Sequence, residues 1–119
     1  MKMKVEIEPT PQVRPRVSLE SRCVYEPKHM KAYKSVISTQ ARIVMGAQPI
    51  MTGAVVMILK FYRKYKATSR RYGDFDNLAK AVCDALNGIV YADDSQIVSC
   101  RIEKYKDKNQ RIEVECYEL

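Results

Sequence analysis

The feature that most constrains the fold is a nearly continuous apolar segment at residues 53–62. Its longest unbroken apolar run, Ala54–Leu59, has only six residues, so it cannot form a membrane-spanning helix, which needs about 20. A short apolar run of this kind predicts a buried strand. Because the segment has so few polar residues, we expect it to lie in the centre of a sheet.

Three further strands are expected around this segment. Residues 3–7 and 111–117 alternate polar and apolar side chains with a period of two, which is typical of half-buried strands. Another strand is expected at Gln96–Tyr105. The short polar stretch at residues 106–110 predicts a turn, so the last two strands are expected to form a hairpin.

Two helices complete the pattern. Apolar residues recur at spacings of three and four between Pro27 and Gly46, which predicts a helix with one buried face. A second helix is expected from near Asp76 to just before Gly88, where glycine can take a left-handed conformation. The order β-α-β-α-β-β predicts an α/β (α+β) fold: a single domain, residues 1–119, with a mixed sheet of about four strands and two main helices.

Charge is distributed unevenly along the chain, whose net charge is +7. Residues 1–71 carry 15 Lys and Arg against four Asp and Glu, whereas residues 72–119 carry six against ten. A polyanion bound by the basic part, with metals held by the acidic part, would explain this division and favours nucleic acid as a partner. A solvated basic surface is the alternative. Prolines predict an extended basic N-terminal loop with Pro9, Pro11, Pro15, Arg14, Arg16 and Arg22.

The four cysteines, at positions 23, 83, 100 and 116, stand far apart, and the chain has one histidine. A zinc site normally requires closely spaced Cys and His pairs, so we expect none. Cys100 and Cys116 fall on the apolar side of strand patterns and are interpreted as buried. No apolar stretch follows the basic N-terminus, so we expect no signal peptide, a cytoplasmic location and no membrane partner.

Carboxylates gather in the segment that begins Gly73-Asp74-Phe75-Asp76. On a helix through residues 77–87, polar and apolar side chains separate onto opposite faces. The pair Asp93-Asp94 follows, and the return of the chain is expected to bring it beside the first two aspartates. The polar face comprises Asn77, Lys80, Asp84 and Asn87, and the apolar face comprises Leu78, Ala81, Val82, Ala85 and Leu86.

Clustered carboxylates without a nearby histidine or cysteine suit a hard cation such as Mg²⁺ or Mn²⁺. Such a cation promotes phosphodiester hydrolysis because it neutralises the phosphate, lowers the pKa of the attacking water and stabilises the leaving oxygen. Structural roles are the alternative. Asp76 would then cap the helix, Lys80 and Asp84 would form a surface ion pair, and Asp93-Asp94 would form a polar turn.

The acidic segment resembles the signature of the RusA family of Holliday junction resolvases. The matching residues are Asp74-Phe75-Asp76-Asn77-Leu78-x-Lys80, Asp84-x-Leu86-Asn87-Gly88 and Tyr91-x-Asp93-Asp94-x-Gln96-Ile97. Two shorter segments, Pro11-x-x-Arg14-Pro15-Arg16 and Tyr25-x-Pro27, are similar to the basic N-terminal region of that family. The resemblance therefore spans most of the chain.

The resemblance implies a Mg²⁺-dependent crossover junction endodeoxyribonuclease, with Mn²⁺ as a substitute metal. Such an enzyme resolves four-way DNA junctions by paired symmetrical nicks, as a homodimer, in DNA recombination and repair. The resemblance also implies that Asp74, Asp76 and Asp94 bind the metal and that Lys80 is a catalytic lysine. The supporting residues are Asp93, Asn77 and Asp84.

Branched DNA is the implied partner, held largely through phosphate contacts. In the family, an aromatic side chain just before the first catalytic aspartate helps to open the junction. Tyr72 is the nearest candidate here, although Gly73 intervenes. The expected DNA-binding residues are Arg14, Arg16, Lys64, Lys66, Arg70, Arg71 and Tyr72.

Two other functions remain open on the sequence alone. A non-catalytic architectural protein would bind DNA junctions without cutting them. A regulatory module would dock an acidic protein through its basic half, with no preference for branched DNA and little response to Mg²⁺. Metal-dependent nicking of a junction separates the predicted enzyme from both.

Overall fold

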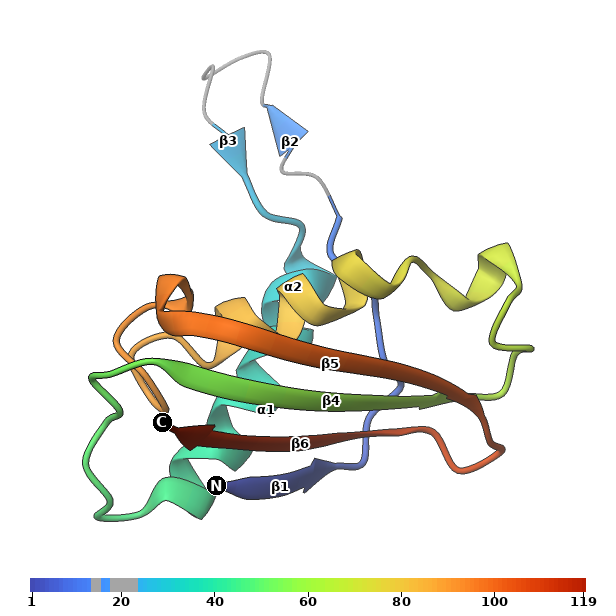
Figure 1. Cartoon of the computed structure of the whole chain (residues 1–119). Helices are drawn as coiled ribbons and strands as arrows, with labels where there is room; N and C mark the ends of the chain where they lie inside the picture. Colours follow the sequence, from blue (N-terminus) through green and yellow to red (C-terminus); the bar gives the residue numbers. More distant parts are fainter. Residues whose placement is uncertain (14–15, 18–23) are drawn as a thin grey trace.

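A four-stranded mixed sheet, in the order β1-β6-β4-β5, forms the centre of the computed structural model (Figure 1). The structure describes residues 1–13, 16–17 and 24–119. The sheet consists of β1 (Lys2–Val5), β4 (Val55–Arg63), β5 (Ile97–Lys106) and β6 (Arg111–Glu118). With two main helices, this arrangement confirms the fold predicted from the order of the elements.

β4 is a central strand, as its apolar sequence predicts, but β5 and β6 do not form the expected hairpin. β4 pairs antiparallel with β6 on one side and parallel with β5 on the other. The parallel pairing requires a crossover, which the second helix provides between β4 and β5. The polar residues at 107–110 therefore carry the chain across the end of β4 instead of closing a two-stranded turn.

Both main helices cover the same face of the sheet (Figure 1). They are α1 (Lys28–Met45) and α2 (Phe75–Ala85), close to the predicted bounds. Apolar side chains of both helices pack against alternate residues of the central strand. The resulting core includes the fully buried residues Met30, Ile37, Val55, Met57, Leu59, Phe61, Leu78, Ala81, Val82 and Leu86.

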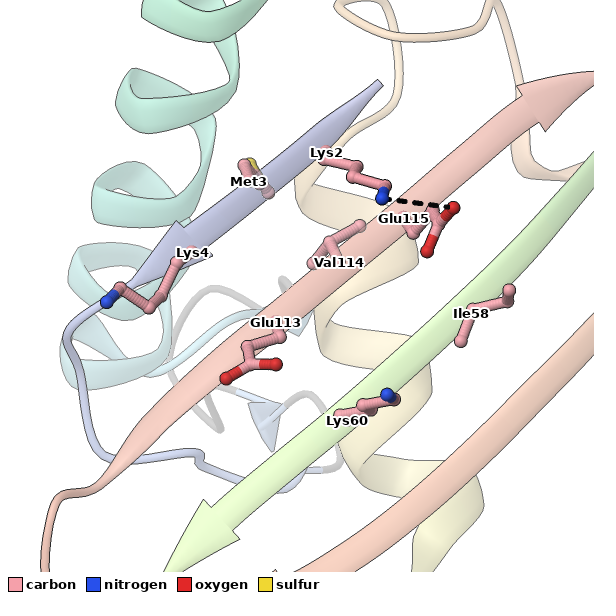
Figure 2. Close-up of a pocket in the computed structure, with 8 residues that line it drawn as sticks. All are labelled: Lys2, Met3, Lys4, Ile58, Lys60, Glu113, Val114 and Glu115. Carbon is pink, nitrogen blue, oxygen red and sulfur yellow. Dashed lines mark ion pairs between the residues drawn. The ribbon is translucent and has the colours of Figure 1, made fainter.

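The opposite face of the sheet carries alternating charges (Figure 2). β1 pairs antiparallel with β6, so Lys2 stands opposite Glu115, and their charged groups are 3.9 Å apart. On the other side of β6, Lys60 of β4 stands opposite Glu113. These residues, together with Ile58, line a shallow groove of about 450 Å³ across the face. An acidic strand thus lies between two basic ones.

The prolines led us to expect an irregular N-terminal segment, but part of this segment forms regular structure. Two short strands, β2 (Arg16–Val17) and β3 (Val24–Tyr25), pair antiparallel in a ribbon that projects from the rest of the molecule (Figure 1). Proline blocks regular structure only where its missing N–H is needed, and neither short strand contains one. Arg14, Arg22 and Cys23 lie outside the described residues.

The cysteine predictions had different outcomes. Cys116, on β6, is buried against the helices. Cys100 is exposed, contrary to the prediction, because β5 is an edge strand with no fully buried residue. Across the described ranges, no helix has the length and apolar character needed to cross a membrane.

Candidate active site

Two aspartates of the acidic segment stand exposed at the start of α2. Asp74 is the N-cap residue by its backbone, yet its side chain makes none of the capping hydrogen bonds that usually occupy such a residue. Asp76 lies in the first turn, and one carboxylate oxygen accepts the backbone N–H of Asn77 at 2.9 Å. Helix capping therefore does not account for either carboxylate in full.

α2 separates polar and apolar side chains as its sequence predicts. The predicted apolar residues are all buried against the sheet and α1. Asp76, Lys80 and Asp84 are four residues apart and so follow one another along a single face. The Lys80 ammonium lies 4.0 Å from the Asp84 carboxylate, so the predicted ion pair is present, with Lys80 largely exposed.

The neighbouring residues Asp93 and Asp94 have different surroundings. The Asp93 carboxylate accepts the N–H of Ser95 at 3.0 Å and caps a short 3-10 helix, η2 (Asp94–Gln96). The Gln96 side chain accepts the N–H of Asp93 and donates to the carbonyl oxygens of Met51 and Gly53. Asp93 and Gln96 thus have structural roles, and they hold Asp94 in place without occupying its carboxylate.

Asp94 lies beside the C-terminal half of α2. Burial raises the pKa of its carboxyl, the negative charge of Asp93 and a side-chain hydrogen bond with Asp84 raise it further, and Lys80 lowers it. Within residues 1–13, 16–17 and 24–119, no three His, Cys, Asp or Glu side chains converge closely enough to hold one metal ion. The expected convergence of Asp94 with both Asp74 and Asp76 is therefore not seen, and Asp84 is its carboxylate neighbour instead.

Basic side chains from the sheet fix the backbone that precedes Asp74. The guanidinium of Arg63, which is buried at the end of β4, donates to the carbonyl oxygen of Tyr72 at 2.6 Å. Lys104, on β5, donates to the carbonyl oxygen of Gly73 at 3.0 Å. The position of the first aspartate is therefore set by the sheet as well as by α2.

Tyr72 does not have the surface role that the sequence suggested. It is fully buried, and its hydroxyl lies 2.6 Å from the carbonyl oxygens of both Phe61 and Tyr105. The hydroxyl also accepts the N–H of Tyr105 at 3.1 Å. Its polar group anchors the ring to two strands, so Tyr72 cannot insert into DNA without unfolding this part of the core.

Position 73 requires glycine because of its backbone conformation and because of its close contact with Pro11. Its φ of 98° lies in the left-handed region that favours glycine. A Cβ atom at this position would also lie 2.8 Å from Cγ of Pro11. Gln12, which follows Pro11 in the chain, donates its backbone N–H to the carbonyl oxygen of Asn77 at 2.9 Å. The N-terminal segment therefore packs directly against the start of α2.

The exposed aromatic side chain of the segment is Phe75, to which the sequence analysis assigned no role. Its side chain is 60% exposed, and it stands between the two aspartates at the first position of α2. A large apolar side chain at a helix start usually turns inward, where burial stabilises it. The only sequence signal for this exposure is the placement of Leu78 and Ala81 on the buried face of the helix.

Basic side chains surround the aromatic ring of Tyr65 in the loop after β4. The guanidinium groups of Arg63 and Arg71 lie 4.9 Å and 5.3 Å from its centroid, and the Lys64 ammonium lies at 5.8 Å. Of the predicted DNA-binding residues, Lys64, Lys66, Arg70 and Arg71 are exposed. Arg16 lies on β2, and Arg14 lies outside the described residues.

The chemistry of this site is that of oxygen ligands and ammonium groups. Carboxylates at Asp74, Asp76 and Asp94, with an amide at Asn77, are hard donors of the type that Mg²⁺ prefers. Mg²⁺ keeps several waters and accepts substrate phosphate oxygens, so two carboxylates suffice to hold it. The contact between the carboxyls of Asp84 and Asp94 fits this view, because a nearby cation would relieve the repulsion between them when both are ionised.

The contact between Asp84 and Asp94 predicts a pH effect. Asp94 binds a cation only when ionised, so cation affinity should rise as pH increases through its raised pKa. Asp84→Asn removes one negative neighbour and leaves an amide that can donate to the ionised carboxylate, so we expect the pKa of Asp94 to fall. A ¹³C NMR titration of the Asp94 carboxyl measures this directly. An unchanged midpoint in the variant would contradict the contact.

Comparison with known proteins gives two findings. The sequence model of a family described as "Endodeoxyribonuclease RusA" matches residues 6–117. A protein of Bacillus subtilis (strain 168), named "Uncharacterized protein YqaN", is 33% identical to this chain over 136 aligned positions. The alignment covers 96% of this chain and 93% of the relative.

Proposed function

This chain belongs to the RusA family of endodeoxyribonucleases, and we propose from this that it resolves four-way DNA junctions by paired, metal-dependent nicks. We propose Mg²⁺ as the metal, with Mn²⁺ as a substitute, and DNA recombination and repair as the setting. Branched DNA is then the substrate, and the exposed face of α2 is the surface at which it is cut.

The observation that carries the proposal is that structural roles do not fully account for the carboxylates of Asp74, Asp76 and Asp94. Asp74 makes no capping bond, Asp76 is exposed, and Asp94 is held in place by its neighbours with its own carboxylate free of the cap. Structural aspartates would instead resemble Asp93, whose carboxylate caps η2. Carboxylates presented on a fixed backbone are what a metal-dependent hydrolase requires.

In the proposed reaction, Asp74, Asp76 and Asp94 would hold the cation, and because these carboxylates do not converge on one point among the described residues, cation binding would have to draw them together. A bound Mg²⁺ supplies charge neutralisation at the scissile phosphate and a lowered pKa for the attacking water. The Lys80 ammonium is exposed beside these residues and binds a non-bridging phosphate oxygen, where it stabilises the charge that develops on the phosphorus oxygens. Asp84, paired with Lys80, orients that ammonium.

The loop after β4 supports DNA binding near this site. Its exposed basic side chains follow the strand that carries Arg63, and Arg63 in turn holds the backbone before Asp74. Phosphate contacts of this type release counterions, so we propose that junction affinity falls steeply as the salt concentration rises. The basic residues proposed for binding are Arg14, Arg16, Lys64, Lys66, Arg70 and Arg71.

Phe75 replaces Tyr72 as the proposed aromatic contact with the junction. Its exposed ring can stack on an unpaired base, an interaction that contributes about 1–3 kcal/mol by alanine substitution. Phe75→Ala should therefore weaken junction binding by about tenfold while leaving the free energy of unfolding almost unchanged. Fluorescence anisotropy and urea denaturation measure the two quantities. Full affinity in the variant would exclude the contact.

We propose that two copies associate through the uncovered face of the sheet. A two-fold axis across this face would set the acidic residues of β6 in one copy against the basic residues of β1 and β4 in the other. Glu115→Lys breaks this complementarity and should shift the dimer toward monomer in light scattering. Lys108→Glu, in the turn outside the face, is the control. A monomeric wild-type protein would reject the proposal.

The test of the proposed function is nicking of a synthetic mobile four-way junction, with Mg²⁺ or Mn²⁺ against a chelator. Wild type should produce paired nicks only with metal, and Asp76→Asn should bind the junction without cutting it. The substitution removes charge while it keeps the shape of the side chain and an oxygen for the Asn77 N–H. If the wild type binds the junction but cuts it with neither Mg²⁺ nor Mn²⁺, this result would support the architectural alternative instead.

A further inference from the structure

A pocket with several charged and amide side chains in its lining adjoins the proposed active site on the side of the N-terminal segment. It has a volume of about 420 Å³. Residues of α2 form one wall of the pocket. Residues that flank the β2–β3 ribbon, with one residue of α1, form the other walls. The lining residues are Gln12, Val13, Glu26, Lys34, Asn77, Lys80 and Asp84.

The charges around the pocket largely cancel one another. The Lys34 ammonium contacts the carboxylates of both Glu26 and Asp84, the latter at 3.5 Å, and its side chain is only 16% exposed. Asp84 also pairs with Lys80 at 4.0 Å. A phosphate would meet two carboxylates here, and a metal ion would meet two ammonium groups. The pocket therefore suits an uncharged group that forms hydrogen bonds.

The side-chain oxygen of Gln12 is a hydrogen-bond acceptor in the pocket lining to which no structural role has been assigned. Its side-chain nitrogen donates to the carbonyl oxygen of Val13 at 3.1 Å and to Glu26 at 3.3 Å. Both partners are acceptors, so the orientation of the amide is fixed. Its oxygen is buried and has no partner within the described parts of the chain. Buried acceptors of this kind are uncommon and call for a donor.

We propose that this pocket binds a nucleobase of the strand being cut, next to the scissile phosphate. The inference rests on the proposed function, because Lys80 both lines the pocket and contacts the phosphate in that scheme. A nucleobase is flat and uncharged, it carries N–H donors for the Gln12 oxygen, and its ring faces pack on apolar groups such as Val13. Bases at a junction crossover are the ones most easily unstacked. The pocket thus makes cleavage depend on the sequence at the crossover.

The experiment measures single-turnover cleavage of four junctions that differ only in the nucleotide beside the cleaved phosphate. Wild type should cut the best at least about tenfold faster than the worst. Gln12→Met keeps the side-chain volume without its hydrogen bonds, so it should reduce this ratio to about twofold or less. Gln40→Ala is the matched control, because Gln40 lines a pocket of similar size on the far side of α1, which α2 does not line.

A second readout follows binding without cleavage. A junction with 2-aminopurine at the crossover, bound in Ca²⁺, should become brighter with wild type as the base leaves the stack, and less so with Gln12→Met. Equal cleavage of all four junctions, or the same preference in Gln12→Met, would overturn the base pocket and leave the nuclease intact. A wild type that never cuts refutes the proposed function, and the fluorescence change then decides the pocket separately.

Discussion

Asp94→Asn is expected to reduce metal-dependent junction nicking by at least about 100-fold, whereas Asp93→Asn should leave it within about threefold. The two residues are adjacent and the two substitutions are chemically identical. Asp94 presents its carboxylate beside Lys80 and Asp84, but the carboxylate of Asp93 only caps η2. An asparagine at position 93 keeps an oxygen for the N–H of Ser95, so the cap survives.

Single-turnover rates at saturating Mg²⁺ measure this difference, and junction affinity in Ca²⁺ serves as the control. Both variants should bind the junction as wild type does, because neither side chain is basic. Equal loss of activity in both variants would indicate that the turn itself matters, not the free carboxylate. Retention of activity in Asp94→Asn would remove this residue from the proposed metal site.

Tyr72→Ala is expected to lower the free energy of unfolding by about 3–5 kcal/mol, which is a large part of the stability of a domain. The ring is fully buried and belongs to the core of the domain. Tyr72→Phe keeps the ring and loses only the hydroxyl, which contacts Phe61 and Tyr105, so it should cost about 1–3 kcal/mol. Urea denaturation followed by circular dichroism measures both.

A DNA-contacting tyrosine would behave in the opposite way. Its removal would leave the unfolding transition unchanged and weaken junction binding, as is expected of Phe75. If Tyr72→Phe unfolds at the wild-type urea concentration and binds the junction more weakly, the buried position described for Tyr72 is wrong. The two aromatic residues of one segment therefore provide a paired test of which faces the solvent.

Sequence patterns predicted the four strands of the main sheet and the two main helices, because each of these has a pattern that depends only on its own residues. β4 was recognisable as a central strand because its sequence is almost continuously apolar. The pairing of β5 was not recognisable, because the four polar residues at 107–110 suit a tight turn and a crossing over the end of β4 equally well. Which strand lies next to β5 depends on where α2 packs, and no local pattern encodes that.

In the candidate site, too, the features that depend on local sequence were predictable and those that depend on tertiary packing were not. Asp74, Asp76 and Asp94 could be proposed from the sequence because carboxylates in a motif stand out in any sequence. The roles of the residues that hold the surrounding backbone, such as Gln96 and Lys104, were not predicted because these roles consist of bonds to backbone carbonyl oxygens far along the chain. The exposure of Phe75 was missed because solvent access is a property of the packed molecule and not of the residue type.

The pairing of β1 with β6 also bears on how the protein is made. Lys2 and Glu115 are partners in the sheet although they are synthesised at opposite ends of the chain. While the ribosome is still elongating, Met3 and Val5 have no strand to pair with, and the helices can cover only a partial sheet. Contacts of such long sequence separation slow folding, so we expect the sheet to assemble late, after β6 has left the exit tunnel.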